Sequence, residues 1–156
     1  MVWKPHVTVA AVAEREGRYL LVEECPEGDR VVWNQPAGHL DPGESLIHAV
    51  VRETREETAW GFRPEALVGV YLWQPQADDP ERSFLRLAFT GALTDHDPGQ
   101  ALDQEIIRTR WLCPDELASA PGRLRSPLVL RCIRDHQAGQ RYPLELLHHL
   151  LPPGCP

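Results

Sequence analysis

The sequence has almost no lysine, and its few cysteines are far apart. Lys4 is the single lysine, so arginine carries nearly all of the positive charge. Cys25, Cys113, Cys132 and Cys155 form no CxxC pair, which argues against a zinc site or a disulfide framework and favours a reducing setting. No segment approaches the roughly 18 apolar residues that span a bilayer, and the N-terminus does not resemble a signal peptide. We therefore expect a cytoplasmic protein without a membrane partner.

An excess of positive charge is also lacking. The net charge is -7, and a general nucleic-acid binder needs a basic surface, so we expect no nucleic-acid partner. A phosphorylated small molecule remains compatible, because a bound divalent cation can reverse the sign of an acidic site. The length of 156 residues predicts one domain over residues 1–156 with a substantial core. For the oligomeric state, the sequence is compatible with a monomer and with a homodimer.

The apolar pattern predicts strands, one helix, more strands and then two further helices. The predicted strands cover residues 6–14, 17–24, 31–38, 65–74, 83–93 and 105–112, the first two forming a hairpin. The predicted helices cover residues 45–59, a short segment starting at Pro114, and residues 126–139. This order indicates an α/β protein with a mixed β-sheet and helices packed against it.

The first predicted helix carries a crowded acidic stripe. Glu53, Glu56 and Glu57 fall within an arc of about 100° on a helical wheel. Like charges three and four residues apart each destabilise a helix by a few tenths of a kcal/mol, so the stripe needs an offset. Mg²⁺ and Mn²⁺ take oxygen ligands from such carboxylates. The alternative is a solvated face that Arg52 and Arg55 neutralise.

The residues before the helix favour the metal interpretation, because they complete a fixed spacing. Segment 38–60, GHLDPGESLIHAVVRETREETAW, resembles the signature box of the Nudix hydrolases. That box is Gly, five residues, Glu, seven residues, Arg-Glu, an aliphatic residue, any residue, Glu-Glu, any residue, Gly and an aliphatic residue. The matching positions are Gly38, Glu44, Arg52, Glu53, Glu56 and Glu57. Thr54 replaces the aliphatic residue, and Ala59 replaces the glycine.

The resemblance implies a Nudix fold, an α/β/α sandwich with a central mixed β-sheet, and hydrolysis of a diphosphate linkage. It implies that Glu53, Glu56 and Glu57 bind Mg²⁺, with Mn²⁺ as a second candidate, and that the carbonyl of Gly38 adds an oxygen. Arg52 is then expected to act in the catalytic site as an orienting group.

Arg52 is expected to orient the carboxylates by pairing with Glu44 or Glu56, because its planar fork suits that task. Three residues are candidates for the general base. In several Nudix enzymes it lies outside the box, and here Glu105 is the first candidate and Asp103 the second. Glu53 is the alternative within the box.

Further segments resemble the bacterial NudJ-type phosphatases of this family: KPHVTVA (4–10), WNQPAGHL (33–40), LRSPLV (124–129) and GQRYPLE (139–145). This resemblance implies Mg²⁺-dependent release of phosphate from nucleoside tri- and diphosphates and from thiamine or hydroxymethylpyrimidine pyrophosphate. A nucleoside triphosphate pyrophosphohydrolase or a dinucleoside polyphosphate hydrolase of the same fold is the alternative. A non-catalytic nucleotide-sensing module is disfavoured, since such modules usually lose a box carboxylate.

Three residues before the box are candidates for contacts to the ring of a substrate. Trp33 is expected to stack on a base or pyrimidine ring, and a large core aromatic at a strand end is the equal alternative. Asn34 or Gln35 would then hydrogen-bond to the edge of that ring.

Three further residues are candidates for contacts to phosphate. His39 lies beside the box. Arg86 and Arg125 are candidates for the distal phosphate, although arginines on a surface are more often only solvated.

The sequence offers two candidates for the left-handed residue that ends the acidic helix. A left-handed turn at Ala59 would cost on the order of 1 kcal/mol, because alanine carries a Cβ. Gly61 could take the turn instead and lengthen the helix slightly.

Overall fold

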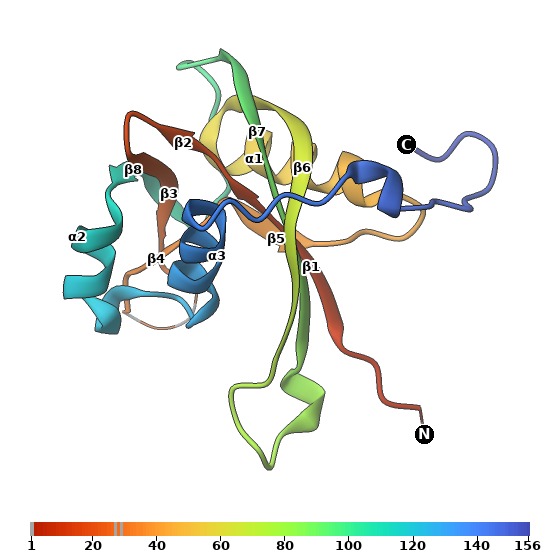
Figure 1. Cartoon of the computed structure of the whole chain (residues 1–156), viewed down its shortest axis with the longest axis horizontal. Helices are drawn as coiled ribbons and strands as arrows, with labels where there is room; N and C mark the ends of the chain where they lie inside the picture. The colour runs from red at the N-terminus through yellow and green to blue at the C-terminus, as the bar shows by residue number, and fades with distance from the viewer. Residues whose placement is uncertain (1, 27, 29) are drawn as a thin grey trace.

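The computed structural model describes residues 2–26, 28 and 30–156, which form two β-sheets with helices against them (Figure 1). The strands are β1 (His6–Val12), β2 (Glu14–Arg15), β3 (Arg18–Glu24), β4 (Val32–Asn34), β5 (Ala37–His39), β6 (Trp60–Trp73), β7 (Phe84–His96) and β8 (Ile106–Leu112). The helices are α1 (Leu46–Thr58), α2 (Pro114–Ser119) and α3 (Leu128–Gln137), with 3-10 turns η1 (Pro80–Arg82), η2 (Pro121–Arg123) and η3 (Leu144–Leu146). Within these ranges no helix is both long enough and apolar enough to cross a membrane.

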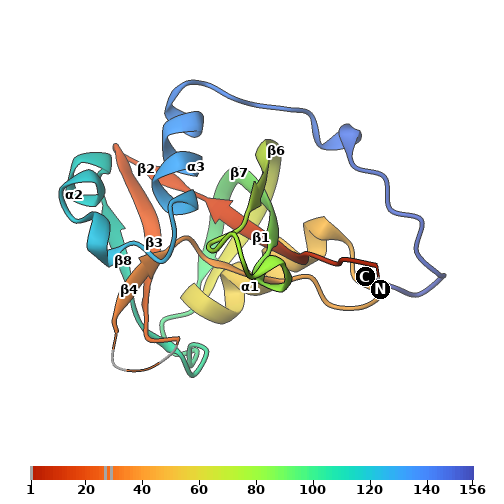
Figure 2. The same cartoon turned by 90° about the horizontal axis from the view of Figure 1, so that it is seen from below.

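The predicted mixed sheet is confirmed, and a second sheet accompanies it. The first sheet has the order β5-β1-β7-β6, in which β1 runs parallel to β7 and the other pairs are antiparallel. In the second sheet β3 pairs antiparallel with β2, β4 and β8. Figure 2 shows α2 and α3 beside the second sheet and α1 against the strands of the first.

Two cores on opposite sides of the strands make the α/β/α sandwich. Alternate residues of β3 face opposite sides, as the period of two along a strand requires. Leu20 packs in the core that contains Val50 of α1, and Leu21 packs in the core that contains Ile133 of α3. The central strands are therefore buried on both faces, which accounts for their continuous apolar runs.

Several strand boundaries differ from the prediction because the chain changes sheet. The predicted strand 6–14 divides at Ala13, so β1 joins one sheet and β2 the other, and the predicted hairpin is limited to β2 and the start of β3. The predicted strand 31–38 divides into β4 and β5 around Pro36, which has no N–H for a ladder. Strand β6 begins at Trp60, and its register shifts between Pro64 and Ala66, where the proline is accommodated.

Helix α1 ends in a left-handed residue that is not glycine. Ser45 caps the start, where its side chain accepts from the N–H of His48. Ala59 ends the helix with φ 61° and ψ 10°, and its N–H donates to the carbonyl of Arg55. The alternative turn at Gly61 is therefore wrong. Gly61 serves another purpose, because a Cβ there would collide with the side chain of Thr94.

Candidate functional site

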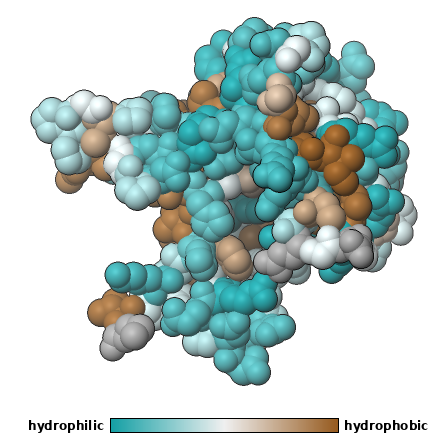
Figure 3. Space-filling model, turned by 180° about the vertical axis from the view of Figure 1, so that it is seen from behind, coloured by the Kyte–Doolittle hydropathy of each residue, from teal (hydrophilic) through white to brown (hydrophobic). Residues whose placement is uncertain are grey.

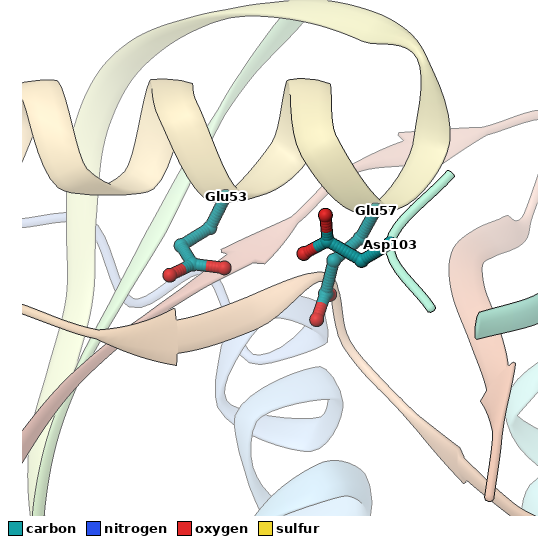
Figure 4. Close-up of side chains that lie close together, drawn as sticks. All are labelled: Glu53, Glu57 and Asp103. Atoms are coloured by element: carbon teal, nitrogen blue, oxygen red, sulfur yellow. The ribbon is translucent and has the colours of Figure 1, made fainter. Parts of the chain in front are cut away.

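Three carboxylates converge beside β5. Glu53, Glu57 and Asp103 each offer an oxygen, and these oxygens all lie within 4.8 Å of one another (Figure 4). The two glutamates lie one helical turn apart on α1. Asp103 comes from the segment before β8, and its N–H donates to the carbonyl of Glu56 at 3.0 Å, which fixes it beside the helix. Hard oxygen donors in this arrangement are compatible with a divalent cation.

The electrostatics of the two glutamates also suit a cation. Burial raises the pKa of Glu57 to about 9, against the hydrogen bond that it accepts from the N–H of Ala37. Burial likewise raises the pKa of Glu53, while the hydrogen bond from Arg52 acts in the opposite direction. Neighbouring carboxylates, Asp103 among them, add to the rise at both sites. A divalent cation would favour the ionised forms and remove this cost, so the donor set fits such an ion.

Gly38 allows the main chain of β5 to approach these carboxylates. A Cβ built on Gly38 would overlap the carboxyl group of Glu53. A side chain at this position would therefore displace the carboxyl group of Glu53 from its place in the structure. Gly38 also lies on the wall of the adjoining cavity.

Arg52 joins the box residues into one network. Its guanidinium donates to Glu44 through Nε at 3.0 Å and Nη2 at 2.6 Å, to Glu53 at 2.8 Å and to Glu56 at 3.1 Å. It also donates to the carbonyl of His39. The bonds from Arg52 hold the pKa of Glu44 down at about 2, so this buried carboxylate is a permanent partner for the arginine. These contacts have the geometry of the expected orienting group.

Glu56 and Glu105 are not members of the three-carboxylate group. Glu56 contacts Arg52, and its side chain is 41% exposed. It is not one of the three carboxylates that share the 4.8 Å cluster of the described residues, in which Asp103 takes a place. Glu105 is exposed and lines the adjoining cavity.

A cavity of about 450 Å³ adjoins the carboxylates and is large enough for a small-molecule ligand. Figure 3 shows the molecule hollowed near the middle of one face. Glu53 and Glu57 line the cavity, as do the basic side chains Arg86 and Arg125. It therefore brings acidic and basic groups to one space, as a metal-bound phosphate would require.

Arg86 is a buried cation with weak partners. Its guanidinium donates to the side-chain oxygens of Gln35 at 3.2 Å and Asn34 at 3.4 Å. Its Nε has no hydrogen-bond partner among the described residues, although the residue is only 6% exposed. Burial lowers the pKa of its guanidinium, and the nearby carboxylates of Glu24 and Glu57 act in the opposite direction. Arg86 also lines the cavity, where an anion would add a charged partner for its guanidinium.

Trp33 and Gln35 do not line the cavity, where a ligand's ring would have to contact them. Trp33 packs in the core with Leu21, and its indole N–H donates to Glu23 at 2.9 Å. It is absent from the described residues that line the cavity, so the core alternative describes its position. Gln35 is 1% exposed and donates to the carbonyl of Val129 while it accepts from Arg86. Gln35 therefore holds the guanidinium of Arg86 without lining the cavity itself.

The remaining expected contacts do reach the cavity. His39 lines it, and burial lowers the pKa of its ring, which favours the neutral imidazole. Arg125 lines it too, with its Nε 4.0 Å from a carboxylate oxygen of Glu24. Glu24 is a buried lining residue that the sequence analysis missed. The sequence feature that could have identified Glu24 is the pair of acidic residues at the end of the largely apolar β3.

Comparisons with known proteins agree with this geometry. A family model described as the NUDIX domain matches residues 4–131. The phosphatase NudJ of Escherichia coli and that of Shigella flexneri are each 43% identical over 145 residues, which cover 93% of this chain and 92% of theirs.

Solved structures give the same result. A NUDIX hydrolase from Nitrosomonas europaea shares 47% identity with a TM-score of 0.88, over 94% of this chain and 97% of that one. The ORF135 protein of E. coli shares 25% identity with a TM-score of 0.65, over 88% of this chain and 94% of that one. The chain therefore belongs to the family of NUDIX hydrolases.

Proposed function

We propose that the protein hydrolyses phosphoanhydride bonds in nucleoside tri- and diphosphates and in related pyrophosphates, and that it releases phosphate. Thiamine pyrophosphate and hydroxymethylpyrimidine pyrophosphate belong to the proposed range. The observation that carries the proposal is the cavity lined by Glu53, Glu57 and Arg86, because it holds two of the three converging carboxylates together with a buried guanidinium whose Nε has no partner among the described residues. The name of the relative, phosphatase NudJ, supports phosphate as the product.

Glu53, Glu57 and Asp103 would hold Mg²⁺, with the Gly38 carbonyl as a further donor and Mn²⁺ as the second candidate ion. Glu56 would join them by leaving Arg52, to which it is hydrogen-bonded here. When bound, such an ion neutralises charge on phosphate oxygens and lowers the pKa of bound water.

The remaining residues divide between positioning and proton transfer. Arg52 and Glu44 hold Glu53 in place, and Arg86 and Arg125 bind phosphate oxygens. Water adds to phosphorus, the bond from phosphorus to the bridging oxygen breaks, and the proton of the water passes to a base. Glu105 is the proposed base, because it lines the cavity but stands outside the converging carboxylates.

Removing one charge from the converging carboxylates should slow turnover strongly. We expect Glu57→Gln to lower kcat by at least about two orders of magnitude in saturating Mg²⁺, because a metal-binding charge disappears with little change of shape. Glu65→Gln is the matched control, since Glu65 is exposed on β6 and pairs with Arg63. Steady-state kinetics of both variants measures the effect. Near-normal turnover of Glu57→Gln would contradict the assignment.

The role of Glu105 is visible in the pH dependence of the rate. A general base must be deprotonated, so its removal should alter the acidic limb of the pH–rate profile and lower kcat by about 10² or more. Glu105→Gln is the test, and Glu81→Gln in η1 is an exposed control outside the cavity. If the acidic limb and kcat both stay as in the wild type, Glu105 is not the base.

Product identification separates the proposed phosphatase from the related alternatives. With Mg²⁺ and a nucleoside triphosphate, we expect orthophosphate and the diphosphate as the first products, detected by chromatography. Pyrophosphate with a monophosphate would instead establish a nucleoside triphosphate pyrophosphohydrolase. Preferential cleavage of dinucleoside polyphosphates would establish the other alternative.

A further inference from the structure

Aromatic rings form a continuous row along one side of the cavity. Trp73 stacks with Phe84 at a centroid distance of 5.6 Å, and Phe84 stacks with His6 at 5.3 Å. His6 meets His39 edge-on at 5.4 Å. The four rings come from the four strands of the mixed sheet, since β6, β7, β1 and β5 are neighbours. Trp73, Phe84 and His39 line the cavity.

The strand register ties this row to the candidate phosphate site. Trp73 pairs with Phe84, and Phe84 pairs with His6, so these rings lie at the same level of the sheet. Arg86 is two residues after Phe84 on β7 and therefore lies on the same face, about 7 Å further along the strand. Thr8 pairs with both Arg86 and His39. One face of the sheet thus carries a row of rings next to a guanidinium.

The rest of the cavity lining also contains both apolar and charged side chains. Pro26, Pro75 and Leu128 add apolar surface to the lining, whereas Glu53 and Glu57 bring the carboxylates. A ligand with a flat ring at one end and phosphates at the other matches both kinds of surface. Inorganic polyphosphate would match only the charged part.

We propose that Trp73 and Phe84 form a subsite for the heteroaromatic ring of the substrate, while Arg86 and the carboxylates receive its phosphate groups. This inference rests on the proposed function and adds the residues that select ring-bearing substrates. Stacking on an aromatic side chain accepts any base, because every base has a π-face. The subsite therefore favours purine and pyrimidine compounds alike over phosphates without a ring. It takes the role that the sequence analysis gave to Trp33.

A cross-strand pair of aromatic residues also stabilises a hairpin without binding anything, so the test must compare ligands. The probes are β,γ-methylene ATP, β,γ-methylene CTP and inorganic tripolyphosphate, each titrated by calorimetry in Mg²⁺; the methylene group replaces the bridging oxygen of the bond that the proposed reaction breaks. The wild type should bind both nucleotide analogues about tenfold or more tightly than tripolyphosphate. Trp73→Ala should weaken the preferred analogue at least about tenfold and leave tripolyphosphate within about twofold. Trp73→Phe should keep most of the affinity, because a ring remains.

Leu72→Ala is the matched control, since Leu72 is the neighbour of Trp73 on β6, is 64% exposed and points to the other face. Phe84→Leu keeps apolar volume without a ring and replaces Trp73→Ala if that variant does not fold. Equal weakening of nucleotide and tripolyphosphate, or no weakening of either, would overturn the subsite. So would a wild type that binds all three probes equally.

The same measurements separate this inference from the proposed function. If the wild type prefers the nucleotide analogues through Trp73 but hydrolyses no phosphoanhydride, the proposed function fails and the ring subsite stands. If it hydrolyses nucleotides and tripolyphosphate with equal efficiency and Trp73→Ala changes neither, the ring subsite fails alone.

Discussion

The carboxylates of Glu53, Glu57 and Asp103 converge where burial and mutual repulsion raise the pKa of both glutamates. Neighbouring residues hold these carboxylates in place despite their mutual repulsion. Arg52 binds Glu53 while Glu44 fixes the arginine, and both interactions come from residues of the same helix and the turn before it. Crowding that would only cost stability in an ordinary helix is the condition for binding a hard cation.

The segment WNQPAG (33–38) connects the two halves of the site, because it crosses from one sheet to the other. Before the crossing, Asn34 and Gln35 hold the guanidinium of Arg86. After it, the N–H of Ala37 donates to Glu57 and the bare backbone of Gly38 makes room for Glu53. A shift of this short segment would move Arg86 and the carboxylates together. The break that divides the predicted strand 31–38 into β4 and β5 therefore helps to position the residues of the site.

Local patterns were enough to predict the parts of the site that lie on one helix. The box spacing grouped Arg52 with Glu44 and Glu53, which it contacts in the structure. The mixed sheet with its helices followed from the order of elements. The sequence could not place Asp103, because its position depends on a backbone bond to the carbonyl of Glu56. Burial of Trp33 and the row of rings beginning at Trp73 depend on strand register, which pairs residues far apart in the chain.

Thermal unfolding in a magnesium titration tests most directly whether the three carboxylates form a cation site. At a Mg²⁺ concentration 100 times the Kd, binding should add about 2.7 kcal/mol to the stability of the wild type. That gain corresponds to a Tm increase of roughly 5–10 °C for a domain of this size. Glu57→Gln should lose the increase and Asp103→Asn should reduce it, with metal-free Tm values close to that of the wild type. A wild-type Tm independent of Mg²⁺, or an undiminished response in both variants, would contradict the account.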